Sequence, residues 1–171
     1  MAQIGLFLGT TTGKTANIAE MIQEGLGGED IVSVFEIHEV SDNSELLAYP
    51  YLIIGCPTWD IGELQSDWDQ FFPNLDTIDF SGKKVAYFGT GDQIGYADNF
   101  MDAIGILEAK ISEKGGTTVG QTSTDGYEFD GSKAVRGDQF CGLAIDEDNQ
   151  DDLTDERVSA WIAELKSAFD L

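Results

Sequence analysis

Apolar, β-branched runs separated by helical patterns constrain the fold of this 171-residue chain more than any other feature. The central runs lack the apolar–polar alternation of a half-exposed strand, so they predict strands buried on both faces of a parallel sheet. Strands that alternate with helices through right-handed crossovers give a doubly wound α/β sandwich. The predicted strands are Ile4–Leu8, Ile31–Phe35, Tyr51–Cys56, Val85–Gly89, Thr117–Gly120 and Phe140–Ile145.

Helical patterns fill the intervals between these runs. Gly115 and Gly116 provide a stop signal after the longest central pattern. Residues 121–138 have no clear periodicity, and a loop of this length inside a compact domain is usually functional or a family insertion. We expect this segment to interrupt the last strand of a single domain spanning residues 1–171. The predicted helices are Ala16–Leu26, Ser44–Leu47, Gln65–Phe72, Asn99–Lys114 and Thr154–Phe169, the last opened by the cap pattern Thr154-Asp155-Glu156.

A threonine-rich turn, Gly-Thr-Thr-Thr-Gly-Lys-Thr at residues 9–15, lies between the first predicted strand and the first helix. A helix N-terminus presents unpaired backbone N–H groups and the positive end of the helix dipole, which together favour an anion. Here threonine hydroxyls join those amides, and Lys14 is the only cation nearby in the sequence. The turn predicts a phosphate held by hydrogen bonds more than by ion pairs. The alternative is an ordinary turn that caps a helix.

Two other phosphate-related classes fit this turn poorly. A nucleotide P-loop needs four residues between its glycines, and only three separate Gly9 from Gly13. No predicted strand ends in an Asp suited to holding Mg²⁺ beside the turn. A phosphorelay receiver shares the strand order but needs acids after the first strand, where this chain has threonines.

Two further loops, residues 56–63 and 89–99, follow predicted strands at the same sheet edge, where ligands bind in open α/β sheets. Each carries one large aromatic residue in a turn, Trp59 in the first and Tyr96 in the second. Two such rings on neighbouring loops can sandwich a flat ring system. The three loops together predict a ligand with a phosphate at one end and a planar aromatic group at the other. Thr58, Thr90, Asp92 and Asn99 offer polar groups between the two ends.

The chain is strongly acidic, with 32 Asp and Glu against 9 Lys and Arg and a net charge of −23. Such a field repels nucleic acids and anionic membranes and steers the protein toward basic protein surfaces. The acidic run at residues 146–152 lacks the Gly and terminal Glu of an EF-hand loop. We interpret it as rim charge that also complements the dipole of the last helix.

Cysteine usage and hydropathy indicate the compartment. Cys56 and Cys141 lie far apart, in apolar runs and without metal-binding spacing, so we expect buried, reduced thiols. The first strand leaves no room for a signal peptide, and no apolar run approaches 18 residues. These features predict a soluble, cytoplasmic protein. His38 has no suggestive neighbours in the sequence and is expected at the surface.

The segments Gly-Thr-Thr-Thr-Gly-Lys-Thr, Cys-Pro-Thr-Trp-Asp-Ile-Gly-Glu-Leu-Gln-Ser-Asp-Trp and Phe-Gly-Thr-Gly-Asp-Gln-Ile-Gly-Tyr-Ala-Asp-Asn-Phe resemble those of long-chain, cyanobacterial-type flavodoxins. The resemblance runs essentially end to end. It implies a monomer with a five-stranded parallel sheet of order 2-1-3-4-5, a fifth strand interrupted by a long loop, and noncovalently bound FMN. It places the phosphate on Thr10, Thr11, Thr12, Gly13, Lys14 and Thr15, and the rest of FMN near Thr58, Trp59, Asp60, Ile61, Thr90, Gly91, Asp92, Tyr96, Asn99 and Asp148.

The resemblance also assigns roles. Trp59 and Tyr96 would flank the isoalloxazine, and Asn99 and Asp148 would approach the ring or the ribityl chain. Asp60 is a departure, because the relatives carry Asn where a backbone carbonyl turns toward the reduced flavin. Asp adopts left-handed conformations somewhat less readily and adds charge, so the energy of that turn should differ. Gln121-Thr122 is a second departure, where aromatic residues are expected.

The implied function is that of a low-potential electron carrier, not an enzyme, cycling between flavin semiquinone and hydroquinone. Its partners would be photosystem I and ferredoxin–NADP reductase, with the protein replacing ferredoxin under iron limitation, and nitrogenase is a further candidate. The sequence offers no general base, nucleophile or metal beside a substrate pocket, so the redox chemistry belongs to the cofactor. The closest alternative is an FMN-dependent reductase on the same fold, which would need a nicotinamide or quinone pocket.

Overall fold

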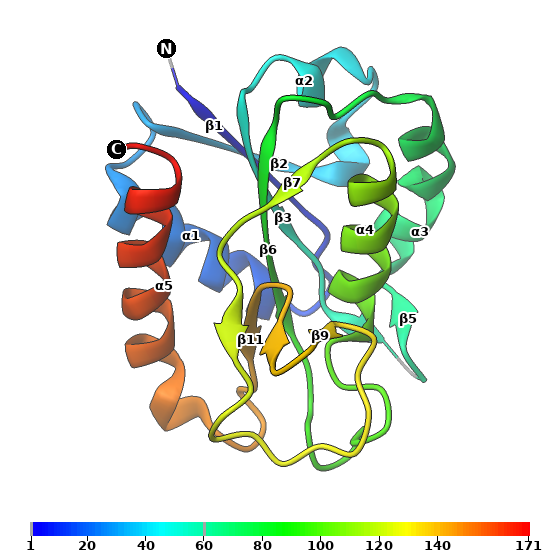
Figure 1. Cartoon of the computed structure of the whole chain (residues 1–171), viewed down its shortest axis with the longest axis vertical. Coiled ribbons are helices and arrows are strands. Elements are labelled where there is room, and N and C mark those ends of the chain that lie inside the picture. Colours follow the sequence, from blue (N-terminus) through cyan, green and yellow to red (C-terminus); the bar gives the residue numbers. More distant parts are fainter. Residues whose placement is uncertain (1, 60) are drawn as a thin grey trace.

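The computed structural model describes residues 2–59 and 61–171 and shows a parallel sheet between two helical layers (Figure 1). Five parallel strands form the main path of the sheet, in the order β2-β1-β3-β6-β11, which confirms the predicted 2-1-3-4-5 arrangement. These strands are β1 (Ile4–Leu8), β2 (Val32–Glu36), β3 (Tyr51–Gly55), β6 (Lys84–Thr90) and β11 (Leu143–Ile145).

The central strand shows why the apolar runs lack alternation. All residues of β1 are buried, and Leu6 pairs with Val34 of β2 on one side and Ile53 of β3 on the other. Because helices cover both faces of the sheet, side chains that point in opposite directions both enter a core. The non-alternating pattern therefore reports burial on two sides.

The helices form two layers. α1 and α5 cover one face of the sheet, and α3 and α4 cover the other (Figure 1). None of the helices in the described part of the chain is long and apolar enough to cross a membrane. The helices are α1 (Lys14–Leu26), α2 (Ser44–Leu47), α3 (Ser66–Phe71), α4 (Asp102–Glu113) and α5 (Thr154–Ala168), with 3₁₀ helices at Ile37–Glu39, Phe72–Thr77 and Asp151–Leu153.

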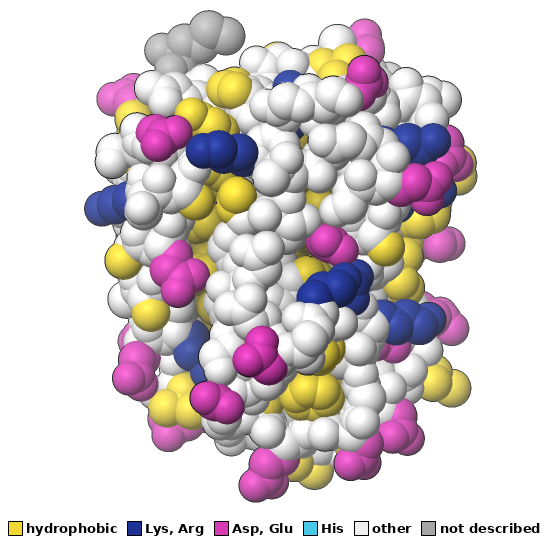
Figure 2. Space-filling view, in the orientation of Figure 1, with side chains coloured by type: hydrophobic (Ala, Val, Ile, Leu, Met, Phe, Trp, Pro, Cys, Tyr) yellow, Lys and Arg dark blue, Asp and Glu magenta, His cyan; other side chains and the backbone are white. Residues whose placement is uncertain are grey.

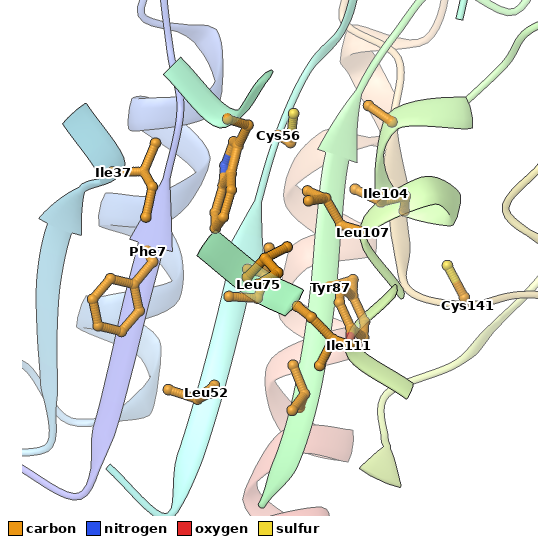
Figure 3. Close-up of a cluster of buried hydrophobic side chains, with 14 of the residues drawn as sticks. Phe7, Ile37, Leu52, Cys56, Leu75, Tyr87, Ile104, Leu107, Ile111 and Cys141 are labelled. Carbon is orange, nitrogen blue, oxygen red and sulfur yellow. The ribbon is translucent and has the colours of Figure 1, made fainter. Parts of the chain in front are cut away.

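Each layer has its own hydrophobic core. Ile18 and Ile22 of α1 and Trp161 of α5 are buried against one face of the sheet. On the other face, Leu107 and Ile111 of α4 pack in a cluster that includes residues of β1, β3 and β6 (Figure 3). The two cores fix the sheet between the helices, so its carboxyl edge is a stable platform for loops.

Two predicted helix starts are wrong. α1 begins at Lys14 instead of Ala16, because Gly13 adopts a left-handed conformation, with φ of 86°, and serves as the N-cap. α4 begins at Asp102 instead of Asn99, because the chain before it forms a series of turns. Glycine reaches such φ values without strain, which explains how the threonine turn joins the helix abruptly.

The predicted cap at the start of α5 is also wrong. A 3₁₀ helix, Asp151–Leu153, runs directly into α5, and Leu153 occupies the N-cap position. The Thr154 hydroxyl donates instead to the Glu147 carboxylate, at 2.8 Å. The hydroxyl therefore ties the helix to the preceding loop.

The fifth strand is interrupted, as predicted. β7 (Thr117–Thr118) and β11 both pair with β6 in parallel, at opposite ends of that strand. The intervening chain forms a small antiparallel sheet of order β8-β10-β9, comprising Thr122–Ser123, Gln139–Phe140 and Val135–Arg136. The sequence did not predict this sheet, since two-residue strands show no alternation.

The prediction of one strand over Phe140–Ile145 is wrong. Phe140 belongs to β10 and only Leu143–Ile145 belongs to β11. The chain bends between them at Gly142, where a Cβ atom would lie 2.0 Å from the Tyr87 carbonyl oxygen. Glycine is required at this bend because the backbone passes directly against β6.

Aromatic residues attach the insertion to the domain. Phe140 lies 5.8 Å from Phe100, 5.0 Å from Tyr127 and 5.3 Å from Phe129, measured between ring centroids. The insertion also lies against α4 at Gly105, where a Cβ atom would be 2.4 Å from the Lys133 carbonyl group. The main chain of the insertion therefore occupies the space a side chain would need.

We predict that Gly105→Ala lowers the free energy of unfolding by about 2 kcal/mol, because the added methyl meets backbone that cannot rotate away. Gly25→Ala in α1 is the matched control. There a Cβ would meet no backbone but only the side chain of Ile162, most closely its terminal Cδ1, and alanine favours the helix by up to about 1 kcal/mol. Urea unfolding of both variants measures the difference. Equal destabilisation would contradict the close backbone approach.

Candidate functional site

Loops at the carboxyl edge of the sheet enclose an open hollow. They follow β1, β3, β6 and β11, strands that lie next to one another in the sheet. Loops from different strands therefore meet here, as expected for a parallel sheet. The hollow is lined by Thr12, Lys14, Pro57, Thr58, Trp59, Thr90, Gly91, Asp92, Tyr96, Glu147 and Asp148.

The threonine turn is folded by its own hydroxyls. The Thr10 hydroxyl accepts a hydrogen bond from the Gly13 amide at 3.2 Å. The Thr15 hydroxyl is buried and lies 3.2 Å from the hydroxyl of Thr90, which links the turn to β6. Thr12 is the threonine of this turn that lines the hollow. The hydroxyls of Thr10 and Thr15 therefore stabilise the turn, whereas Thr12 is available to a ligand.

Gln65 supports the turn from beneath. Its amide nitrogen donates to the Thr11 hydroxyl at 3.2 Å, and its oxygen accepts from the amides of Asp67 and Trp68. The side chain is 1% exposed. Gly9 lies against this group, since a Cβ atom there would be 2.2 Å from the Gln65 amide oxygen. One buried amide therefore caps α3 and holds the threonine turn.

Trp59 and Tyr96 come from different loops and line the same hollow. Trp59 belongs to a short hairpin of β4 (Thr58–Trp59) and β5 (Glu63–Leu64). The Thr58 hydroxyl accepts from the Ala103 amide at 3.1 Å, which fastens this hairpin to the start of α4. Tyr96 is 50% exposed. The hollow therefore has an aromatic side chain on each of two loops and remains open to solvent.

Asp92 shapes the loop after β6. Its carboxylate accepts from the amides of Ile94 and Gly95, at 3.0 and 2.7 Å, and from the Asn149 side chain at 2.7 Å. These bonds, that of Gly95 above all, lower the pKa of Asp92. Because the pKa is lowered on folding, the ionised carboxylate stabilises the loop near neutral pH. That contribution is lost as the pH falls through the lowered pKa.

Asp146 is fully buried and joins two loops. Its carboxylate accepts from the backbone and side-chain nitrogens of Gln93, at 3.1 and 2.7 Å. It also accepts from the backbone amides of Asp148 and Asn149, at 3.1 and 3.0 Å, and from the Asn149 side chain. A buried carboxylate needs this number of donors to offset its lost hydration. The interpretation of residue 146 as rim charge is therefore wrong.

Lys14 is paired with an acid at the hollow. Its ammonium lies 3.0 Å from the Asp148 carboxylate, and both side chains are about half exposed. Asp92, Glu147 and Asp148 line the hollow with this one lysine, so three carboxylates face one cation. The hollow is thus net acidic although it contains the start of α1.

The two cysteines are buried, as predicted, with 0% exposure each. Burial raises the pKa of Cys56 and of Cys141 to about 12, so both thiols are protonated at neutral pH. Cys56 immediately precedes Pro57, which lines the hollow. Neither thiol has the properties of a nucleophile.

The structure brings most of the predicted site residues together, and it places others elsewhere. Ile61 is 78% exposed and does not line the hollow. The Asn99 side chain donates to the Asp102 carboxylate at 3.0 Å, beside Gly62, and also lies outside the lining. Thr10, Thr11, Gly13 and Thr15 shape the turn from behind. Asp60 lies outside the described residues.

Sequence reasoning missed Gln65, Gln93 and Glu147. The two glutamines are each 1% exposed and bind loops at both ends of the hollow. Their only sequence signal is a polar residue at the border of an apolar run, which is common at surfaces as well. Glu147 lines the hollow from within the acidic run, where the sequence distinguishes no single member.

The fold and the hollow define a doubly wound α/β protein with a ligand site at its carboxyl edge. The flavodoxin family model matches residues 6–161. A flavodoxin of Nostoc sp. is 61% identical over 169 residues, covering 99% of this chain and 98% of that protein. A flavodoxin of Synechococcus elongatus is 61% identical over 171 residues, with full coverage of both chains. The chain therefore belongs to the flavodoxin family, in its long-chain, cyanobacterial type.

A solved structure agrees with this assignment. The crystal structure of Fusobacterium nucleatum flavodoxin bound to flavin mononucleotide superposes with a TM-score of 0.91 at 36% identity, covering 98% of this chain and 99% of that one. Flavodoxins are electron-transfer proteins and not enzymes, so the predicted class is confirmed.

We predict that Asp146→Ala lowers the free energy of unfolding by about 3 kcal/mol, because it leaves several buried N–H donors without an acceptor. Asp152→Ala, which removes an exposed acid six residues away, should change it by less than about 0.5 kcal/mol. Urea unfolding measures both. If the two variants lost equal stability, the Asp146 carboxylate would not hold these loops.

Proposed function

We propose that this chain carries single electrons on FMN bound in the carboxyl-edge hollow, from photosystem I to ferredoxin–NADP reductase in place of ferredoxin. The family binds FMN and transfers electrons, which agrees with the cofactor predicted from the sequence. FMN supplies the redox chemistry when bound. The observation that carries the proposal is one hollow that joins the start of α1 to Trp59 and Tyr96.

The threonine end of the hollow fits a phosphate. The first amides of α1 have no partner within the helix, and no acid occupies its first turn. The Thr12 hydroxyl adds a further donor at the hollow. Because Lys14 already pairs with Asp148, hydrogen bonds from these groups would supply most of the binding.

The aromatic end fits an isoalloxazine ring. Offset stacking on Trp59 and Tyr96 would hold a flat ring between two loops whose positions the sheet fixes. Tyr96 is half exposed, so one side of the bound ring would lie close to solvent and to a docked protein. This geometry suits transfer of an electron across a protein surface.

The charges around the hollow favour a low potential. Adding an electron to a bound flavin adds negative charge near Asp92, Glu147 and Asp148. One unit charge at about 10 Å, with an effective dielectric near 20, costs roughly 1.7 kcal/mol, which is on the order of 70 mV. The lysine partly offsets this effect. The remaining carboxylates oppose the second electron and make the fully reduced protein a strong reductant.

The acidity of this chain favours partners with basic surfaces. The chain has a net charge of −23, and the loops near the hollow expose Ile61, Ile94 and Tyr96. Charge steers a basic partner toward this edge, and the exposed apolar groups give it a surface to contact. Nitrogenase, which the family resemblance implied as a further candidate, would need the same type of surface.

We predict that the FMN-loaded protein supports NADPH formation by illuminated photosystem I and ferredoxin–NADP reductase without ferredoxin. The rate should fall severalfold between about 10 and 150 mM salt, because screening weakens the steering. NADPH-dependent reduction without added reductase would favour the FMN-dependent reductase instead. A rate independent of salt would contradict the role given to the acidic surface.

We predict that Asp148→Asn tightens FMN binding severalfold, since it frees Lys14 for the phosphate and removes one repelling charge. Binding of riboflavin, which has no phosphate, should change much less. Quenching of flavin fluorescence by the apoprotein measures both affinities. Asp152→Asn removes the same charge away from the hollow and is the control. Weaker FMN binding by Asp148→Asn would contradict this account.

A further inference from the structure

We propose that Glu36, His38 and Glu39 form a surface site for a divalent transition-metal ion such as Zn²⁺. One ligand atom from each residue lies within 4.8 Å of the others. The His38 Nε2 atom is 3.7 Å from a Glu36 carboxylate oxygen. None of the three lines the hollow, so the site is separate from that of the cofactor.

The backbone holds these residues on one tight turn. Glu36 ends β2, and His38 and Glu39 belong to the 3₁₀ helix that follows at once. Ile37 between them is 1% exposed and packs in the core shown in Figure 3. The Val40 amide closes the turn onto the Ile37 carbonyl at 3.1 Å. With Ile37 pointing inward, the three polar side chains share the outer side of a fixed turn.

The charges around the turn favour a cation. Within the described residues, no lysine or arginine forms an ion pair with Glu36 or Glu39. The first 82 residues contain 14 acids and a single lysine, Lys14. Two partly exposed carboxylates therefore lie beside an imidazole with no ion pair to a lysine or arginine of the described residues.

The donor set selects the class of metal. Imidazole nitrogen suits zinc, copper and nickel, whereas Ca²⁺ and Mg²⁺ prefer oxygen ligands alone. Ligands on one tetrahedral Zn²⁺ lie roughly 3.3 Å apart, given bonds of about 2.0–2.1 Å. The three atoms need to close by about 1.5 Å at most, which exposed side chains achieve by small rotations. Water would complete the coordination.

The test uses the FMN-loaded full chain, expressed without a histidine tag, because His38 is the only histidine in the sequence. Calorimetric titration should show one Zn²⁺ bound with a Kd in the micromolar range. The single pair of imidazole resonances in NMR spectra should shift with the same stoichiometry. His38→Gln and Glu39→Gln should each weaken binding by about tenfold or more.

Glu45→Gln is the matched control, since it removes one acid that is nearby in the sequence but does not belong to the cluster. It should leave the affinity for Zn²⁺ unchanged. Zinc binding that leaves the His38 resonances unmoved, or that survives His38→Gln at full affinity, would overturn the proposal. Displacement of Zn²⁺ by equimolar Ca²⁺ would also overturn it, because only diffuse attraction to acidic residues would then be at work.

Discussion

The buried carboxylate of Asp146 is the interaction on which the ligand edge of this flavodoxin depends. It stands at the end of β11 and accepts hydrogen bonds from Gln93 and Asn149, so it orders the loop after β6 and its own loop together. Gln93 in turn accepts from the Glu128 amide and donates to Gln150, which extends the order to the insertion. Among the described residues no lysine or arginine pairs with this carboxyl group, and fixed N–H dipoles replace its water. Asp146 therefore fixes the shape of the hollow although it does not line it.

The same preference for dipoles over cations recurs at the hollow itself. The start of α1 and the threonine hydroxyls offer N–H and O–H groups, while the one nearby lysine is paired with Asp148. Figure 2 shows acidic side chains around the edge of one face and several basic side chains over the region of α4 and β9. There Lys110 pairs with Asp76 and Arg136 with Glu108, so these cations lie away from the hollow and are largely neutralised. The arrangement keeps the proposed redox site negative.

The sheet was predictable from sequence, and the loops only in part. Runs such as Ile4–Leu8 could be identified as central strands, because a strand buried on both faces has apolar residues at successive positions. Trp59 and Tyr96 were identifiable because large aromatic residues in turns are hard to explain as core. Asp146 was misread because its burial depends on Gln93, 53 residues away, and an acid in an acidic run shows no sign of that partner. The small sheet of the insertion was missed because its two-residue strands are too short to show alternation in the sequence.

The close approach at Gly105 means that the insertion is not a detachable module. Its backbone lies where a side chain of α4 would otherwise be, and Phe100 and Phe140 bury each other across the same junction. A chain without the insertion would leave Asp102, the Gly105 carbonyl and Glu108 of α4 without the hydrogen bonds that Lys133 and Arg136 donate, and would leave a notch at Gly105. Gain or loss of this segment in evolution must therefore be accompanied by changes within α4. The insertion and the sequence of α4 are therefore matched to each other, through the glycine at residue 105.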